Sequence, residues 1–223
     1  MQAHTSSRLA RAGRCVALTL AVILPLASGA RAAALKGRVQ LGGGDPAVVW
    51  LEGLSGTIPA GSETVITHRP GGRFEPTVSI GFVGGEYVLR TEDDTLHTTH
   101  LYLQLAGQKA VSGRPLRNGA TVFNIAQPRA PMEMRRPITA YQRYREDTGH
   151  IAVRCNPHPK EKAFVLVFDH PYATVSDAKG AFTLPDVPDG KHDVWVWHDG
   201  QARKWRTVEF GAGLADVVID PAP

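Results

Sequence analysis

The sequence predicts an all-β protein built from β-sandwiches. Short apolar runs recur along the chain, clusters of Gly, Pro and Asp separate them, and almost no stretch shows a helical period. Many short strands at this spacing are typical of sandwich architecture. The predicted strands cover residues 37–41, 48–51, 78–82, 86–90, 151–155, 163–168, 182–184, 193–197 and 215–219.

Residues 1–32 have the features of an export signal. Three arginines, Arg8, Arg11 and Arg14, precede an apolar run over 15–27, and Ala30-Arg31-Ala32 forms a small-x-small cleavage site. The apolar run is shorter than the roughly 20 residues that span a bilayer. We therefore expect a signal peptide over 1–32, a periplasmic or secreted mature chain, and no stable membrane insertion after cleavage.

The predicted cleavage also removes the basic excess of the chain. The whole sequence has 25 Lys+Arg against 21 Asp+Glu, and residues 1–32 contain four arginines and no acid. The mature chain is therefore close to neutral. Without a basic patch, nucleic acid is not an expected partner.

Cys155 would be the lone cysteine of the mature chain. Ile151, Val153 and Cys155 share one face of a strand-like run, and His158 follows across a turn that contains Pro157. An unpaired thiol in an exported protein is open to oxidation, so its presence needs a reason. It is either a small buried apolar residue or a metal ligand, and the histidine three residues later favours a ligand.

His97 and His100 lie in a second histidine-containing segment, just after the strand predicted over 86–90. Two imidazoles and one thiolate with a weak fourth ligand form the trigonal arrangement of electron-transfer copper sites. Zinc is the rival metal, although structural zinc sites usually have four closed ligands, often with paired cysteines. If residues 97–100 are extended, the two histidines lie on opposite faces, which favours a single ligand, His97.

These segments resemble the cupredoxin (plastocyanin-like) family. More narrowly, the chain is similar to exported bacterial proteins, some labelled methylamine-utilisation proteins, that join a cupredoxin to a carboxypeptidase-regulatory-like module. The matching segments are Phe74-Glu75-Pro76 followed by Val78, the run from Asp93 through His97 to His100, and Cys155-Asn156-Pro157-His158, with residues 169–198 resembling the second module.

The resemblance implies two domains after the signal peptide. Residues 33–168 would form a Greek-key cupredoxin-like β-sandwich, and residues 169–223 a small transthyretin/carboxypeptidase-regulatory-like β-sandwich. Residues 35–53 also resemble the first strands of the second module. Whether the copper domain is inserted into that module is left open.

The resemblance also implies a copper site. His97 and His158 would be the imidazole ligands and Cys155 the thiolate, but Glu161 stands where the family pattern has methionine. As a harder, anionic donor, a carboxylate would favour Cu(II) and lower the reduction potential. Glu161 is otherwise a solvated turn residue between two lysines. Thr91 and Thr98 replace two family asparagines, which alters the hydrogen bonds that hold the ligand loops.

Three features remain open at this stage. Residues 103–148 are predicted to be a long, partly ordered connection. Met132 and Met134 within it are either packing residues or soft ligands. Trp195 and Trp197 share a strand face, which suits either a core position or aromatic stacking on a ligand.

The favoured function is one-electron transfer by an exported copper protein with a redox partner protein. No nucleophile elbow or other catalytic constellation is evident, so we do not expect an enzyme. The alternatives are a metal-free β-sandwich binding or scaffold protein, and a copper storage or delivery protein that uses the same ligands.

Overall fold

The all-β prediction is confirmed by a computed structural model, which describes residues 33–104, 119–145, 149–211 and 214–219. These residues form sixteen strands in four sheets and one 3₁₀ turn, η1 (Ala140–Gln142). The predicted signal peptide lies outside the described residues. Within them, no helix is long and apolar enough to cross a membrane.

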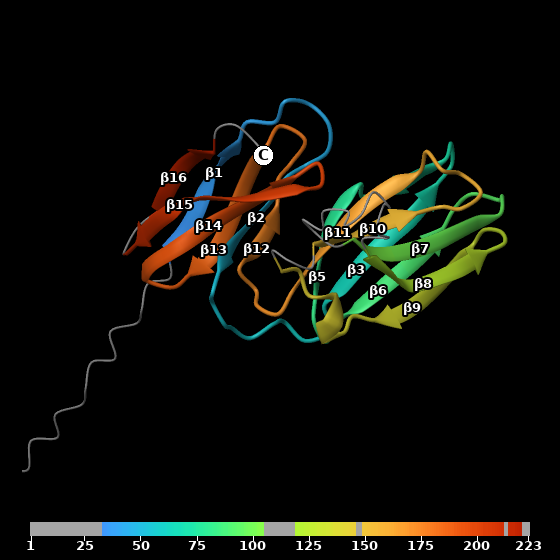
Figure 1. The fold of residues 1–223 in the computed structure, drawn as a ribbon, viewed down its shortest axis with the longest axis horizontal. Coiled ribbons are helices and arrows are strands. Elements are labelled where there is room, and N and C mark those ends of the chain that lie inside the picture. The colour runs from blue at the N-terminus through green and yellow to red at the C-terminus, as the bar shows by residue number, and fades with distance from the viewer. Residues whose placement is uncertain (1–32, 105–118, 146–148, 212–213, 220–223) are drawn as a thin grey trace, which may run out of the picture. The chain divides into compact units, whose positions relative to one another are not determined.

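Strands β3 to β11 form the first sandwich (Figure 1). One sheet has the order β4-β3-β6-β9 and the other β5-β11-β10-β7-β8. Their bounds are β3 Glu63–Arg69, β4 Arg73–Glu75, β5 Val78–Phe82, β6 Glu86–Thr91, β7 His97–Gln104, β8 Gly119–Gln127, β9 Met132–Pro137, β10 His150–Arg154 and β11 Lys162–Phe168. The facing sheets bury alternate apolar side chains such as Ile66, Leu89, Leu101, Ile151 and Val165.

Strands β1, β2 and β12 to β16 form the second sandwich. Its sheets have the orders β13-β1-β16 and β12-β2-β14-β15. Their bounds are β1 Ala33–Val39, β2 Val48–Glu52, β12 Ala173–Val175, β13 Ala181–Val187, β14 Gly190–His198, β15 Gln201–Phe210 and β16 Leu214–Ile219. The first two strands of the described chain thus pair with strands beyond residue 172. The domain boundaries and the type of this module stay predictions.

Two parts of the first sandwich differ from the sequence-based expectation. Strands β8 and β9 occupy residues predicted to belong to a long connection, whereas residues 105–118 and 146–148 of that connection lie outside the described residues. Both strands lie at sheet edges and are half-exposed, so their side chains lack a clear apolar alternation. Strands β3 and β7 were also not predicted, although β7 alternates buried and half-buried residues along its whole length.

The tryptophans of β14 pack in a core. Trp197 is fully buried, and Trp195 stacks on Trp50 with ring centroids 5.9 Å apart. Trp197 belongs to a third apolar cluster, which also contains Val78 and Leu166 of the β5-β11 pair, and partly buried Trp195 packs against this cluster. The core interpretation is therefore confirmed for Trp197.

Candidate metal centre

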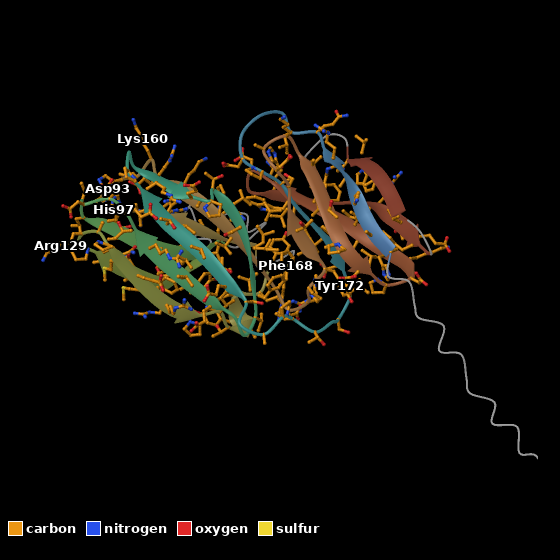
Figure 2. The ribbon with its side chains drawn as sticks, turned by 180° about the vertical axis from the view of Figure 1, so that it is seen from behind. Asp93, His97, Arg129, Lys160, Phe168 and Tyr172 are labelled. Atoms are coloured by element: carbon orange, nitrogen blue, oxygen red, sulfur yellow. The ribbon has the colours of Figure 1, made fainter. Side chains whose placement is uncertain are left out.

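The four metal ligands proposed from the sequence lie together at one end of the first sandwich: His97, Cys155, His158 and Glu161. β10 pairs antiparallel with both β7 and β11, so the start of β7 lies beside the end of β10 and the turn that leads into β11. His97 is the first residue of β7, and Cys155 directly follows β10. Figure 2 shows His97 at the same end as Asp93 and Lys160, while Phe168 lies at the far end of β11.

The turn between β10 and β11 holds the other two residues. The backbone N–H of Glu161 donates to the carbonyl of His158 at 2.9 Å, which closes a tight turn. Every third residue of this folded loop carries a donor atom, at Cys155, His158 and Glu161. This geometry brings three side chains from a seven-residue segment to one point.

The donor atoms of this group lie within contact of one another. Cys155 Sγ is 3.6 Å from His97 Nδ1 and 3.5 Å from His158 Nδ1. Glu161 Oε1 is 3.6 Å from His97 Nδ1 and 3.1 Å from His158 Nδ1. Four donors around one ion at metal–donor distances of about 2.0–2.3 Å would be separated by roughly 3.3–3.7 Å in a tetrahedral arrangement. The observed spacing is close to that of a single-ion site.

The Glu161 carboxylate supplies an independent test of fit. Its side chain is 1% exposed, and its Oε1 atom is buried without a hydrogen-bond partner. A buried carboxylate oxygen without a donor is costly, and a cation among the four donors would remove that cost. The residues present therefore fit a bound metal ion. Glu161 is not a solvated turn residue.

His68 joins this group although its position in the sequence did not identify it. It lies on β3, in the sheet that faces β7 and β10, and it is completely buried. Together with His97, Cys155 and Glu161 it forms a cluster whose donor atoms all lie within 4.8 Å of one another. Its ring packs against the rings of Phe74 and His97, each with a centroid distance of 4.3 Å.

A local signal for His68 was available. Thr64, Ile66 and His68 share one face of a run rich in β-branched residues, and Ile66 is a core residue. That pattern places the imidazole on the inner face of a strand. No local pattern shows which residues lie opposite, because Glu161 is 93 residues away.

The remaining candidates lie away from the four donors. His100 is on the opposite face of β7 from His97, as expected for an extended segment, and its ring contacts Asn156 Oδ1 and Thr121 Oγ1. Met132 and Met134 lie on β9, where Met134 packs against the apolar core. These positions favour packing for the methionines and a surface role for His100.

Burial shifts the pKa values at the centre towards the neutral forms. Burial raises the pKa of the Cys155 thiol, and it raises the pKa of Glu161 against the opposing effect of His97. Burial, followed by the charges of His97 and His158, lowers the pKa of His68 to about 3. Each shift reflects the cost of an isolated charge, which a bound cation would offset for the thiolate and the carboxylate.

Hydrogen bonds hold the donors in place from outside. The N–H of Thr98 donates to Cys155 Sγ at 3.4 Å, and Thr98 Oγ1 accepts from the N–H of Asn156 at 2.8 Å. His97 Nε2 lies 3.0 Å from Thr95 Oγ1, which leaves Nδ1 to face the thiol. The hydroxyl of Thr98 thus links β7 to the loop that follows Cys155. The family pattern described above has asparagine at this position. Such contacts orient ligands and fix tautomers.

The four donor residues differ in exposure. The side chain of His158 is 40% exposed, whereas those of His97 and Glu161 are 1% exposed. His158 is therefore the most exposed residue of the four-donor group.

Comparisons with known proteins give distant structural likeness over about half of the chain. A reduced single-site mutant of amicyanin is 14% identical, with a TM-score of 0.30 and coverage of 49% of this chain and 85% of that chain. An oxidised amicyanin mutant is 14% identical, with a TM-score of 0.31 and coverage of 53% and 97%. A copper-containing nitrite reductase from Thermus scotoductus is 18% identical, with a TM-score of 0.31 and coverage of 52% and 24%.

No family model matches the chain, and no curated protein matches it. Similarity this distant leaves the donor geometry as the basis for a functional conclusion.

Proposed function

We propose that this chain is an exported copper-binding protein that transfers one electron between partner proteins and does not act as an enzyme. The observation that carries the proposal is the four-donor group, three of whose residues are buried, in which two imidazole nitrogens, one sulfur and one carboxylate oxygen are separated by 3.1–3.6 Å in four of their pairs. His97, Cys155, His158 and Glu161 would hold the ion.

Copper is the favoured metal because of the donor chemistry. Thiolate and imidazole ligands suit both Cu(I) and Cu(II), so bound copper would supply a reversible one-electron couple. The same donors also suit zinc in tetrahedral geometry. Sites of this kind generally bind Cu(II) more tightly than Zn(II), which supports copper where both ions are present.

Electron transfer is favoured over substrate turnover by the way the residues enclose the centre. Three of the four donor residues are buried, and only His158 is substantially exposed. A buried, fully ligated ion has no open position for a substrate, whereas an exposed ligand edge gives a partner protein close contact. Export and a redox partner protein belong to the same proposal and rest on the signal-like segment.

Copper addition to the reduced apo-protein tests the proposal. We expect Cu(II) to give a visible thiolate-to-copper charge-transfer band that is lost in Cys155→Ser and in His158→Ala. His100→Ala is the matched control, because this imidazole lies on the outer face of the same strand as His97. A wild-type protein that binds no copper, or an unchanged band in Cys155→Ser, would support the metal-free scaffold instead.

Copper storage or delivery is a second candidate, favoured by the exposed edge of His158, which also offers a route for metal exchange. Voltammetry and chelator competition separate the two functions. An electron carrier should cycle reversibly and release copper slowly to a chelator. A delivery protein should lose its metal readily and cycle poorly.

A further inference from the structure

A buried chain of polar side chains leads away from Glu161 into the sandwich. Glu161 Oε2 lies 3.1 Å from His68 Nδ1, and His68 Nε2 lies 3.1 Å from Thr99 Oγ1. Thr99 Oγ1 in turn hydrogen bonds the side-chain amide of Gln127. All four residues are at most 3% exposed, so these contacts are shielded from water.

We propose that His68, supported by Thr99 and Gln127, is a positioning residue that binds one oxygen of the Glu161 carboxylate and leaves only the other, Oε1, to face the metal donors. This inference rests on the proposed metal-binding function. It assigns a role to three residues outside the four-donor group and makes Glu161 a one-oxygen ligand.

The two oxygens of the carboxylate already have different surroundings. Oε2 has its contact with His68, whereas Oε1 faces His97 and His158 and has no hydrogen-bond donor. A carboxylate without such a partner could rotate and offer both oxygens to one ion. The contact with His68 restrains that rotation and so favours single-oxygen ligation.

His68 is better placed to hold Glu161 than to bind the ion itself. Both of its ring nitrogens already have polar partners, Glu161 and Thr99. Its ring also packs against those of Phe74 and His97, which restrains any reorientation. His68 also offers a ring nitrogen within 4.8 Å of donor atoms of His97, Cys155 and Glu161, so the test below separates positioning from direct ligation.

The direction of the hydrogen bonds follows from the charge on Glu161. When Glu161 is ionised, as it would be beside a bound cation, its carboxylate only accepts, so His68 Nδ1 then carries the proton and Nε2 accepts from the Thr99 hydroxyl. Thr99 Oγ1 is then free to accept from the amide of Gln127. In the structure the amide oxygen faces Thr99 while Gln127 Nε2 is buried without a partner. The reversed amide orientation places an N–H against Thr99 and gives an uninterrupted series of donors that ends at Glu161.

A double-mutant cycle tests the assignment. His68→Leu is compared in the wild-type background and in Glu161→Met, which has no oxygen for His68 to hold. In the wild-type background we expect copper affinity to weaken by about 10- to 100-fold, as for other residues that orient metal ligands, with a changed Cu(II) electron paramagnetic resonance spectrum. In the Glu161→Met background the same change should leave both readouts nearly unaltered.

His68→Asn is the conservative variant. Its side-chain amide N–H can occupy the place of the Nδ1 proton, so we expect it to restore much of the wild-type spectrum. An equal loss of copper affinity for His68→Leu in both backgrounds would overturn the inference and indicate a direct ligand or a purely structural residue. Failure of the wild-type protein to bind copper is a separate result, which would overturn the proposed function itself.

Discussion

The two sandwiches bury different kinds of side chain. The core cluster of the second sandwich consists of buried Ala, Val, Leu, Ile and Phe, and the buried polar residues in or beside its strands include Ser176 and His198. The first sandwich has a comparable apolar core, but one end of it also encloses His68, His97, Thr99, Gln127 and Glu161. Apolar burial stabilises a fold without directional demands, whereas each buried polar group costs free energy unless it is paired. The first sandwich therefore gathers more buried polar side chains at one place, and under the proposed function a bound metal ion would offset their cost.

The largest expected effect comes from creating a void in the second sandwich. Leu35 is completely buried in its core, so Leu35→Ala should lower the free energy of unfolding by about 2–5 kcal/mol, measured by urea titration. Copper affinity of the folded variant should stay at the wild-type level. Leu101→Ala is the matched change on β7, the strand that carries His97, and it should weaken both stability and copper binding. Weakened copper binding in folded Leu35→Ala would break the comparison.

Acid should act on the first sandwich through a buried histidine outside the metal centre. Burial, followed by the charge of Arg154, lowers the pKa of His150 from 6.5 to about 4. As the pH falls below 6.5, His150 binds a proton in the unfolded chain but stays neutral in the folded protein. The free energy of unfolding therefore decreases until the pH reaches about 4. The shift corresponds to roughly 3 kcal/mol.

His150→Phe tests this acid effect. Phenylalanine suits the position because His150 packs edge-on against Phe164 and Trp197. We expect the variant to lose about 3 kcal/mol less stability than the wild type between pH 7 and pH 4, measured by urea titration at each pH. Identical losses in the two proteins would show that this histidine does not contribute to acid sensitivity.

Burying the Glu161 carboxylate without a metal ion should lower the free energy of unfolding of the apo-protein. Burial raises the pKa of Glu161, so the folded state favours the protonated acid and loses stability as the pH rises through that raised pKa. Glu161→Gln imitates the neutral form, and it should raise apo-protein stability at pH 7 by about 1–3 kcal/mol. This gain should shrink as the pH falls.

With copper bound, the wild type should become more stable than Glu161→Gln, because a carboxylate binds the ion more tightly than an amide does. Urea titration with and without copper measures both parts. If the Glu161→Gln apo-protein is less stable than the wild-type apo-protein, the carboxylate is already well paired without metal.

The predictability of these features from the sequence depended on distance along the chain. The sequence proposed His97, Cys155, His158 and Glu161 as donors, and the structure brings these four side chains together. Three of them lie within a seven-residue segment, and His97 was proposed from a resemblance to a family motif. His68 was missed because its partners, Thr99 and Glu161, are 31 and 93 residues away. The apolar runs of β2, β5, β6, β10 and β11 were predicted, whereas edge strands β8 and β9 were not, since exposed edges carry little apolar pattern. Strands β3 and β7 were missed because histidine and threonine occupy several of their buried positions.

The smallest expected effect on copper binding is that of a substitution on the outer face of β7. His97 is buried among the donors, whereas His100, three residues along the same strand, contacts Asn156, Thr121 and Tyr102 on the outer face. His100→Ala should change copper affinity by no more than about twofold, the range of an ordinary surface substitution. His97→Ala should abolish the charge-transfer band. A large effect of His100→Ala would mean that its contact with Asn156 helps to hold the neighbouring cysteine, and the site would then extend through the sheet to its outer face.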